Sequence, residues 1–235
     1  MTELLYQSDS YLKEFEAVVT AQRTEEHGVV LDRTAFYPGG GGQPNDLGEL
    51  NGIPVVKARK IGGDVVHVLE GDLPPVGQKV EGRLDWDRRY RLMRTHTAMH
   101  VLCGTVFRDY GALVTGGDME PLKGRMDFEF ERLQKELVQV IEEAVNREIR
   151  LGHEIRVKIL PREEAFQIPD LIRTKINLLP EGIQQVRTVE IVGLDLQADG
   201  GTHVRNTTEV GGLRVVDHKS KGAINKRIYI EVDDR

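Results

Sequence analysis

Two histidines, His96 and His100, stand four positions apart in the segment RTHTAMH. In a helix this spacing places both imidazoles on one face, one turn apart, which is the geometry that two metal ligands need. Thr97 occupies the position at which the HExxH metalloprotease motif has a glutamate, so that class would lack its general base here. The pair alone also fits two surface or capped histidines. Metal binding therefore requires further ligands from other parts of the chain.

A second group of potential ligands lies in the segment ADGGTHV, where His203 follows Asp199 by four positions. Gly200 and Gly201 between them favour a tight backbone turn. Because imidazole nitrogen and carboxylate oxygen both bind zinc, the helical pair and this loop pair together predict a Zn2+ site with up to four protein ligands. The residue types leave two roles open for Asp199, which either binds the ion directly or orients a histidine that does.

The third chemical feature is a run of consecutive glycines, Gly39, Gly40, Gly41 and Gly42. Such a run leaves backbone N–H groups unshielded, so that a ligand can approach them closely and an oxyanion can be stabilised by them. The spacing fits neither a P-loop nor a dinucleotide-binding loop, and a flexible loop between strands is an equal alternative. Thr34 and Gln43 flank the run and offer neutral hydrogen-bonding groups.

The composition is that of an ordinary globular chain. Its 235 residues are 39% hydrophobic and 30% charged, which argues against a disordered protein. No apolar run approaches the roughly 18 residues that cross a bilayer, and the acidic start MTELLYQSDSYLKEFEA lacks the features of a signal peptide. The single cysteine, Cys103, excludes an internal disulfide framework and is expected in the core rather than at the metal. These observations predict a cytoplasmic protein without a membrane partner.

The net charge of −6 argues weakly against nucleic acid as a partner. Two local stretches nevertheless carry positive charge that could neutralise phosphates. The first holds Arg83, Arg88, Arg89, Arg91 and Arg94, and the second holds Arg214, Lys219, Lys221, Lys226 and Arg227. The alternative is that both stretches are ordinary solvated faces.

Residues 14–86 carry the pattern of short strands separated by turns. The segments FEAVVTAQ and HGVVLDRT are rich in β-branched residues, and Asn51-Gly52 is a strong hairpin signal. Gly62-Gly63 marks a further turn. About six strands at this spacing predict a small β-barrel or sandwich. We therefore expect a β-barrel domain over residues 1–86 that carries the glycine-rich loop.

From residue 87 the periodicity becomes helical. We expect one helix over about 87–109, which carries the histidine pair, and a second over about 131–150, where a single apolar stripe is clear. Strands are expected at 154–160, 186–193, 211–220 and 225–234. The second part, residues 87–235, is therefore predicted to be a zinc-binding α+β domain with an antiparallel sheet and helices.

Three segments, in this order, resemble the AlaX family of alanyl-tRNA editing proteins and the editing domain of alanyl-tRNA synthetase. They are RTAFYPGGGGQP at 33–44, RTHTAMH at 94–100 and DGGTHV at 199–204. The resemblance spans nearly the whole chain and is to the medium-length form, which has a barrel domain and lacks a long C-terminal extension. Each segment alone is unspecific, whereas the combination is specific.

The resemblance implies that His96, His100 and His203 are zinc ligands. The family commonly has cysteine where this chain has Asp199. Either the carboxylate replaces the thiolate, or three histidines and a water hold the ion. The resemblance also implies that Thr34 helps to select the aminoacyl group and that Gln43 lies near the scissile ester.

The activity implied by the resemblance is trans-editing, the hydrolysis of the aminoacyl ester on mischarged tRNA(Ala). Serine is the chief cargo expected, and glycine is a plausible second one. Thr34 and Gln43 are the expected catalytic residues, and together with Gly40, Gly41 and Gly42 they are the expected substrate-binding residues. Two alternatives belong to other classes: a zinc-dependent hydrolase of a small ester or peptide, and a non-catalytic, zinc-stabilised RNA-binding module. The first would ignore the tRNA body, and the second would need no glycine-rich pocket.

Overall fold

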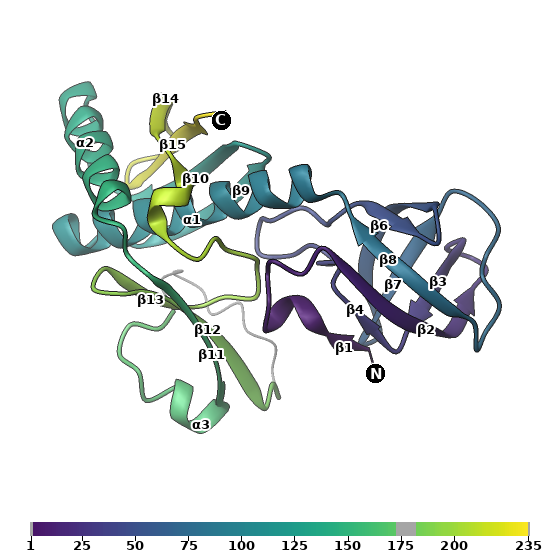
Figure 1. The fold of residues 1–235 in the computed structure, drawn as a ribbon. Coiled ribbons are helices and arrows are strands. Elements are labelled where there is room, and N and C mark those ends of the chain that lie inside the picture. Colours follow the sequence, from purple (N-terminus) through teal and green to yellow (C-terminus); the bar gives the residue numbers. More distant parts are fainter. Residues whose placement is uncertain (1, 173–181, 235) are drawn as a thin grey trace. The chain divides into compact units, whose positions relative to one another are not determined.

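The computed structural model describes residues 2–172 and 182–234, and the chain divides into two compact units, Met1–Arg91 and Leu92–Arg235. The predicted boundary, between residues 86 and 87, lies at the first residue of a long helix, and the observed boundary lies further along the same helix. The first unit is built mainly from strands, and the second mixes helices with antiparallel sheets (Figure 1). The predicted α+β class with an N-terminal sheet domain is thus confirmed.

The first unit consists of short and medium strands. They are β1 (Glu3–Leu4), β2 (Glu14–Arg23), β3 (Gly28–Leu31), β4 (Arg33–Thr34), β5 (Gly48–Leu50), β6 (Ile53–Ile61), β7 (Asp64–Leu69) and β8 (Lys79–Leu84), with a 3-10 helix at Leu5–Gln7. Antiparallel pairing follows the order β2-β3-β7-β6-β5-β8, and β8 pairs again with β2, so the sheet closes on itself. Alternate residues of β2 and β8 point inward and share one apolar core with β3, β6 and β7.

The turn at Asn51-Gly52 connects β5 to β6, and Leu50 pairs directly with Ile53. Both turn residues have positive φ, +50° and +78°, which matches the right-handed twist of a hairpin. The hairpin predicted from this dipeptide is confirmed. Gly62-Gly63 makes a similar connection between β6 and β7 and so fixes the register of β7.

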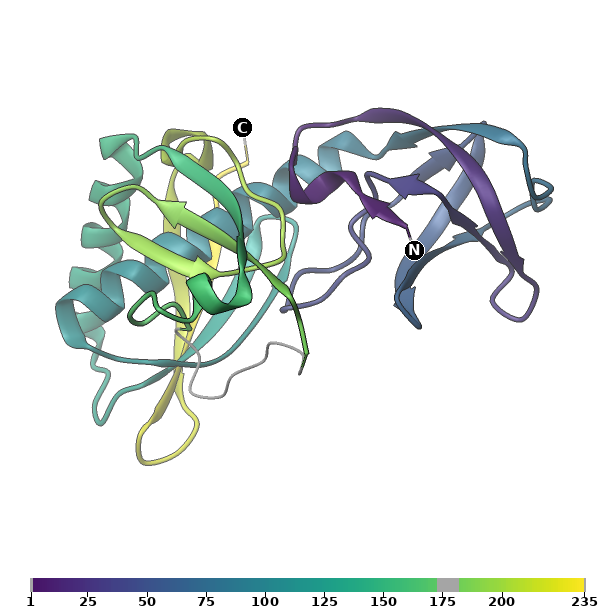
Figure 2. The same ribbon diagram turned by 90° about the horizontal axis from the view of Figure 1, so that it is seen from below.

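The second unit is organised around helix α1 (Trp86–Tyr110), which begins in the first unit. Its other elements are β9 (Val114–Glu120), β10 (Lys123–Glu129), α2 (Lys135–Leu151), β11 (Ile155–Pro161), α3 (Arg162–Ala165), β12 (Gln185–Ile191), β13 (Asp195–Ala198), a 3-10 helix (Thr207–Val210), β14 (Leu213–Ser220) and β15 (Asn225–Val232). One antiparallel sheet has the order β14-β15-β10-β9 and another has the order β11-β12-β13. Figure 2 shows these elements from below.

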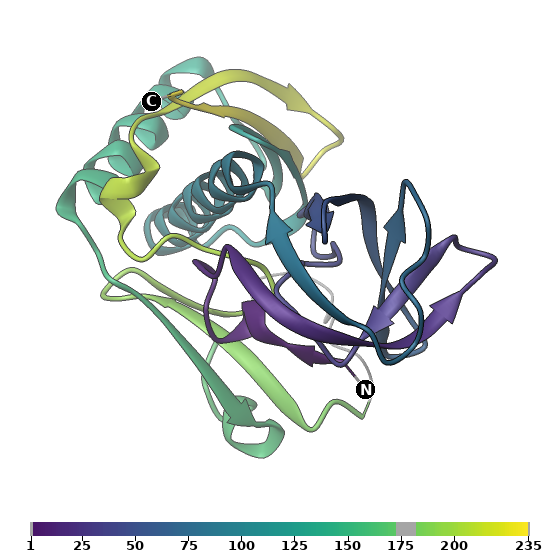
Figure 3. The ribbon, with the colours of Figure 1, turned by 45° about the vertical axis from the view of Figure 1, so that its right-hand side comes forward.

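Helix α1 lies between these two sheets, which is clear when it is viewed nearly end-on (Figure 3). On one side, a Cβ added at Gly104 would lie 2.7 Å from Cβ of Asp195, so the glycine permits close approach to β13. On the other side, Met99 packs against Gly117 and Gly124 of β9 and β10. Residues 92–106 are all buried, so polar side chains on this stretch need partners. No helix among the described residues is long and apolar enough to span a membrane.

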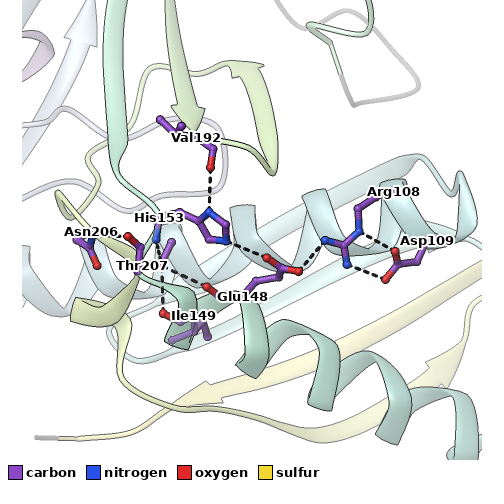
Figure 4. A network of polar contacts seen from close by, with 9 residues as sticks. Arg108, Asp109, Glu148, Ile149, His153, Val192, Asn206 and Thr207 are labelled. Atoms are coloured by element: carbon purple, nitrogen blue, oxygen red, sulfur yellow. Dashed lines mark hydrogen bonds and ion pairs between the residues drawn. The ribbon is translucent and has the colours of Figure 1, made fainter.

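A polar network ties the end of α2 to the strand that follows it (Figure 4). Glu148 accepts a hydrogen bond from Arg108 of α1 at 2.6 Å and lies 2.8 Å from Nε2 of His153. The other ring nitrogen of His153 lies 2.9 Å from the carbonyl oxygen of Val192. The Thr207 hydroxyl donates to the carbonyl of Ile149 at the same helix end. This network holds together the end of α2, the start of the following segment at His153 and the first residue of the 3-10 helix, Thr207.

The hairpin of β9 and β10 was not expected from the sequence. Its strands carry glycines and charges, and their inward residues, such as Met119 and Met126, are too widely spaced to give a strong strand pattern. They are strands because they pair with each other and because β10 also pairs with β15, far along the chain. The first predicted helix is confirmed, and the second begins at Lys135 rather than near residue 131.

Candidate metal centre

Four predicted ligands converge in the second unit. His96 and His100 come from α1, and Asp199 and His203 come from the loop between β13 and the 3-10 helix. Their ligand atoms all lie within 4.8 Å of one another. Asp199 Oδ1 lies 3.6 Å from Nε2 of His96 and 4.0 Å from Nε2 of His100, and Asp199 Oδ2 lies 3.0 Å from Nε2 of His203. Bonds of about 2.0–2.2 Å in a tetrahedron would set ligand atoms roughly 3.3–3.6 Å apart, so the group could hold a metal ion.

The protein orients His203 through its second nitrogen. Nδ1 of His203 lies 3.2 Å from the hydroxyl of Thr97, and the same hydroxyl accepts the N–H of Val204 at 3.2 Å. Nε2 is therefore left to face the other ligands, as is usual for metal-binding histidines with a fixed second nitrogen. Thr97, which replaces the metalloprotease glutamate, thus contributes by orienting a ligand.

The Asp199 loop is held by a turn and by a neighbouring cation. Asp199 Oδ2 accepts the N–H of Gly201 at 2.8 Å. Arg187 of β12 donates to the Asp199 carbonyl at 3.0 Å and lies 3.7 Å from its carboxylate. Sequence reasoning missed Arg187, although a charged residue among Val186, Thr188 and Val189 in a buried strand was a usable signal.

Burial sets the protonation states of the cluster. It lowers the pKa of His96 well below 6.5 and lowers the pKa of His203 to about 4. Burial alone would raise the pKa of Asp199, but His96 and the hydrogen bond from His203 hold it well below 3.8. Neutral imidazoles beside an ionised carboxylate are the forms that bind a metal. In addition, Nδ1 of the buried His100 has no hydrogen-bond partner within the described residues, so protein contacts alone do not explain why this ring is buried.

Cys103 is buried and lies outside the metal-ligand group. Its sulfur accepts a hydrogen bond from Gln197 at 3.3 Å. The prediction of a core thiol is therefore confirmed.

The glycine-rich loop belongs to the first unit and is a defined turn. Gly40 and Gln43 exchange two backbone hydrogen bonds, at 3.0 and 2.9 Å, and the Tyr37 hydroxyl donates to the Gly40 carbonyl at 2.9 Å. All four glycines have positive φ, so side chains would be strained there. Gly40 and Gln43 use their N–H groups within the turn, whereas those of Gly41 and Gly42 donate no hydrogen bond within the described residues.

Thr34 ends β4 in the first unit and is fully buried. Its hydroxyl oxygen lies 2.7 Å from Nε2 of His67 and accepts the N–H of Phe36 at 3.1 Å. Sequence reasoning missed His67. The signal was its place between Val65 and Leu69 at an inward position of an apolar strand.

Two arginines of the first basic stretch, Arg89 and Arg94, are not available to bind phosphates. Arg89 is fully buried and donates to both carboxylate oxygens of Asp46 and to the Ala35 carbonyl. Arg94 is also buried and donates to the Val210 carbonyl at 2.8 Å. The interpretation of these two arginines as phosphate ligands is therefore wrong, because each satisfies buried acceptors of the fold.

The second basic stretch is largely paired. Lys219 lies 3.0 Å from Asp217, Arg227 lies 2.6 Å from Asp127, and Arg214 lies 3.3 Å from Glu231. Lys226 is buried and donates to the carbonyls of Gly222 and Ala223. The alternation of charges across this sheet face favours a solvated face over a phosphate-binding one.

Comparison with known proteins relates both units to one class, the aminoacyl-tRNA synthetases. Residues 5–88 match the family model described as tRNA synthetases class II (A), and residues 186–229 match the threonyl and alanyl tRNA synthetase second additional domain. Part of a longer enzyme is similar too: the alanine–tRNA ligase of Ignicoccus hospitalis is 40% identical over 92% of this chain, which spans 24% of that enzyme.

Several relatives match from end to end. The alanyl-tRNA editing protein AlaX-M of Saccharolobus solfataricus is 44% identical over 99% of both chains. The AlaX-M protein of Methanosarcina mazei is 40% identical over 100% of this chain and 98% of its own. The chain belongs to the AlaX-M family of alanyl-tRNA editing proteins, as the three sequence segments predicted.

Proposed function

We propose that this protein is a trans-editing hydrolase, an aminoacyl-tRNA deacylase that removes the wrong amino acid from mischarged tRNA(Ala) in the cytoplasm. Serine is its principal cargo in this proposal, and glycine is the second. One observation supports the proposal above all others. Three buried histidines and an aspartate converge within 4.8 Å in a chain whose full-length relatives are named alanyl-tRNA editing proteins.

The metal in this proposal is zinc, held by His96, His100 and His203 with Asp199 as fourth ligand. Imidazole nitrogen and carboxylate oxygen both suit zinc, and the spacing of the four side chains supports a tetrahedral arrangement. When bound, zinc supplies a Lewis acid that can polarise an ester carbonyl or activate water. Arg187 and Thr97 would hold the ligands in place.

Other residues of the chain are assigned the remaining tasks. Ester hydrolysis develops negative charge on the carbonyl oxygen, and the N–H groups of Gly41 and Gly42 are the loop donors left to stabilise it. Gln43 is assigned to the scissile ester. Thr34 is assigned to the serine hydroxyl, because alanine is the correct cargo and must be rejected. A site that hydrogen-bonds a substrate hydroxyl can disfavour the analogue without it by up to about 10⁴–10⁵.

One observation favours the second candidate, a non-catalytic zinc-stabilised RNA-binding module. A complete set of four protein ligands is typical of structural zinc, whereas catalytic zinc usually keeps one open position. The role of Asp199 therefore separates the two. If the carboxylate does not bind the ion, three histidines leave the fourth position open.

A deacylation assay on tRNA(Ala) charged with serine, glycine or alanine tests the proposal. The expected result is rapid release of serine, slower release of glycine, and alanine left in place. A parallel reaction with seryl-adenosine, which lacks the tRNA body, separates this activity from a small-ester hydrolase. Equal rates on seryl-adenosine and Ser-tRNA(Ala) would support the small-ester alternative instead.

A further inference from the structure

His67 is a buried histidine of β7 that the proposed function does not use. It is fully buried, and its ring packs edge-on against Phe36 with ring centroids 5.3 Å apart. Nδ1 lies 3.2 Å from the carbonyl oxygen of Val29, and Nε2 lies 2.7 Å from the hydroxyl oxygen of Thr34. Both ring nitrogens therefore have one protein partner each.

The partners decide which nitrogen carries the proton. The Val29 carbonyl can only accept a hydrogen bond, so Nδ1 must be the protonated nitrogen. Burial lowers the pKa of His67 to about 4, which leaves the ring neutral near pH 7 with a single N–H. Nε2 is then an acceptor, and the hydrogen bond at 2.7 Å must be donated by the Thr34 hydroxyl.

The Thr34 hydroxyl can consequently only accept a further hydrogen bond. A hydroxyl has one proton and two acceptor lone pairs. The proton goes to His67, and one lone pair accepts the N–H of Phe36 at 3.1 Å. The remaining lone pair can only accept a hydrogen bond. Because the side chain is fully buried, a polar group brought to it without a matching proton would remain unpaired, which is costly.

We propose that His67 is a positioning residue that holds Thr34 as an acceptor, so that the protein selects an aminoacyl side chain that donates a hydrogen bond. This inference rests on the proposed editing function and adds which partner donates the hydrogen bond: the substrate donates and Thr34 accepts. The serine hydroxyl can donate. A side chain of similar size that carries only an acceptor cannot, and alanine and glycine carry neither group.

The test compares tRNA(Ala) charged with serine and with 3-fluoroalanine, whose fluorine replaces the hydroxyl and has no proton. The native protein should deacylate the serine form faster by roughly three- to tenfold in kcat/KM. His67→Leu frees the Thr34 proton to turn towards the substrate, so the ratio should fall towards one. Thr34→Val should remove the same preference, and the double variant should show no further change, because the two residues act as one unit.

Val65→Ala is the matched control, since Val65 lies two residues before His67 on the same inward face of β7 and makes no hydrogen bond to Thr34. It should lower stability and leave the ratio unchanged. A preserved ratio in His67→Leu, or additive effects of the two substitutions, would overturn the inference.

The tautomer can be measured independently of activity, which matters if His67→Leu does not fold. Nitrogen-15 NMR of the native protein should show His67 as a neutral ring protonated at Nδ1. Finding the proton on Nε2, or a charged ring at pH 7, would overturn the inference whatever the enzyme does. If the native protein deacylates no charged tRNA while the tautomer is as expected, the proposed function fails, and the inference about selection fails with it.

Discussion

Asp199 places its two carboxylate oxygens differently, and Oδ2 lies 3.0 Å from Nε2 of His203 while Oδ1 lies 3.6 Å from Nε2 of His96. The Gly201 N–H donates to Oδ2, so this oxygen is fixed by the turn. A carboxylate held in this way can complete the ligand set that the histidines begin.

If Asp199 binds the ion, Asp199→Ala should lower the affinity for zinc by at least about tenfold, because the ion loses one of its four protein ligands. Asp199→Cys should preserve or raise the affinity, because thiolate suits zinc well. Competition with a chromogenic chelator measures both. Unchanged affinity in the alanine variant would indicate a three-histidine site with an open position.

Thr34→Val should change cargo preference without changing metal content. Valine keeps the shape and removes the hydroxyl, so the serine form loses a hydrogen bond worth about 0.5–1.5 kcal/mol. Serine deacylation should fall roughly tenfold in kcat/KM, while glycine deacylation stays about the same. If both activities fell equally, Thr34 would have a structural or catalytic role. If neither changed, another group must recognise the hydroxyl.

Stability should fall as the pH drops from 6.5 towards 4, in part because of His67. Its pKa is about 4 in the folded chain and 6.5 as an unperturbed group. Between these values the unfolded chain binds a proton that the folded chain does not, so stability is lost on acidification by up to about 1.4 kcal/mol per pH unit. Urea unfolding at pH 7 and pH 5, followed by the only tryptophan, Trp86, measures it. Because His67→Leu lacks the imidazole, its free energy of unfolding should depend less steeply on pH than that of the native protein. An equally steep dependence would show that His67 does not cause the loss.

Arg89→Met should destabilise the first unit by about 3–5 kcal/mol, because it leaves the buried Asp46 carboxylate without its counter-ion. Arg91→Ala is the control, since Arg91 forms an ion pair with the exposed Asp87, which lies one helical turn away. Such a pair is worth about 0.3–0.5 kcal/mol. Denaturation followed by Trp86 fluorescence compares them. Similar small losses in both variants would show that the Arg89 pair is not structural.

Local signals predicted part of this protein well. The hairpin at Asn51-Gly52 depends only on adjacent residues, and the His96–His100 pair depends only on helical spacing. The partners of Arg89 and His67 could not be predicted in this way. Asp46 is 43 positions from Arg89 and Thr34 is 33 positions from His67, so these contacts exist only after the chain has folded. The burial of Arg89 and His67 is therefore known only from the structure.

Metal-dependent editing can be tested by measuring Ser-tRNA(Ala) deacylation with three matched proteins. They are the native chain, His100→Ala and His218→Ala, a histidine of β14 outside the metal group. The native chain and His218→Ala should contain one zinc each, release serine and leave Ala-tRNA(Ala) intact, whereas His100→Ala should lose zinc and at least about a hundredfold in rate. Equal hydrolysis of Ser-tRNA(Ala) and Ala-tRNA(Ala), or full activity of His100→Ala without zinc, would rule out metal-dependent editing of serine by this protein.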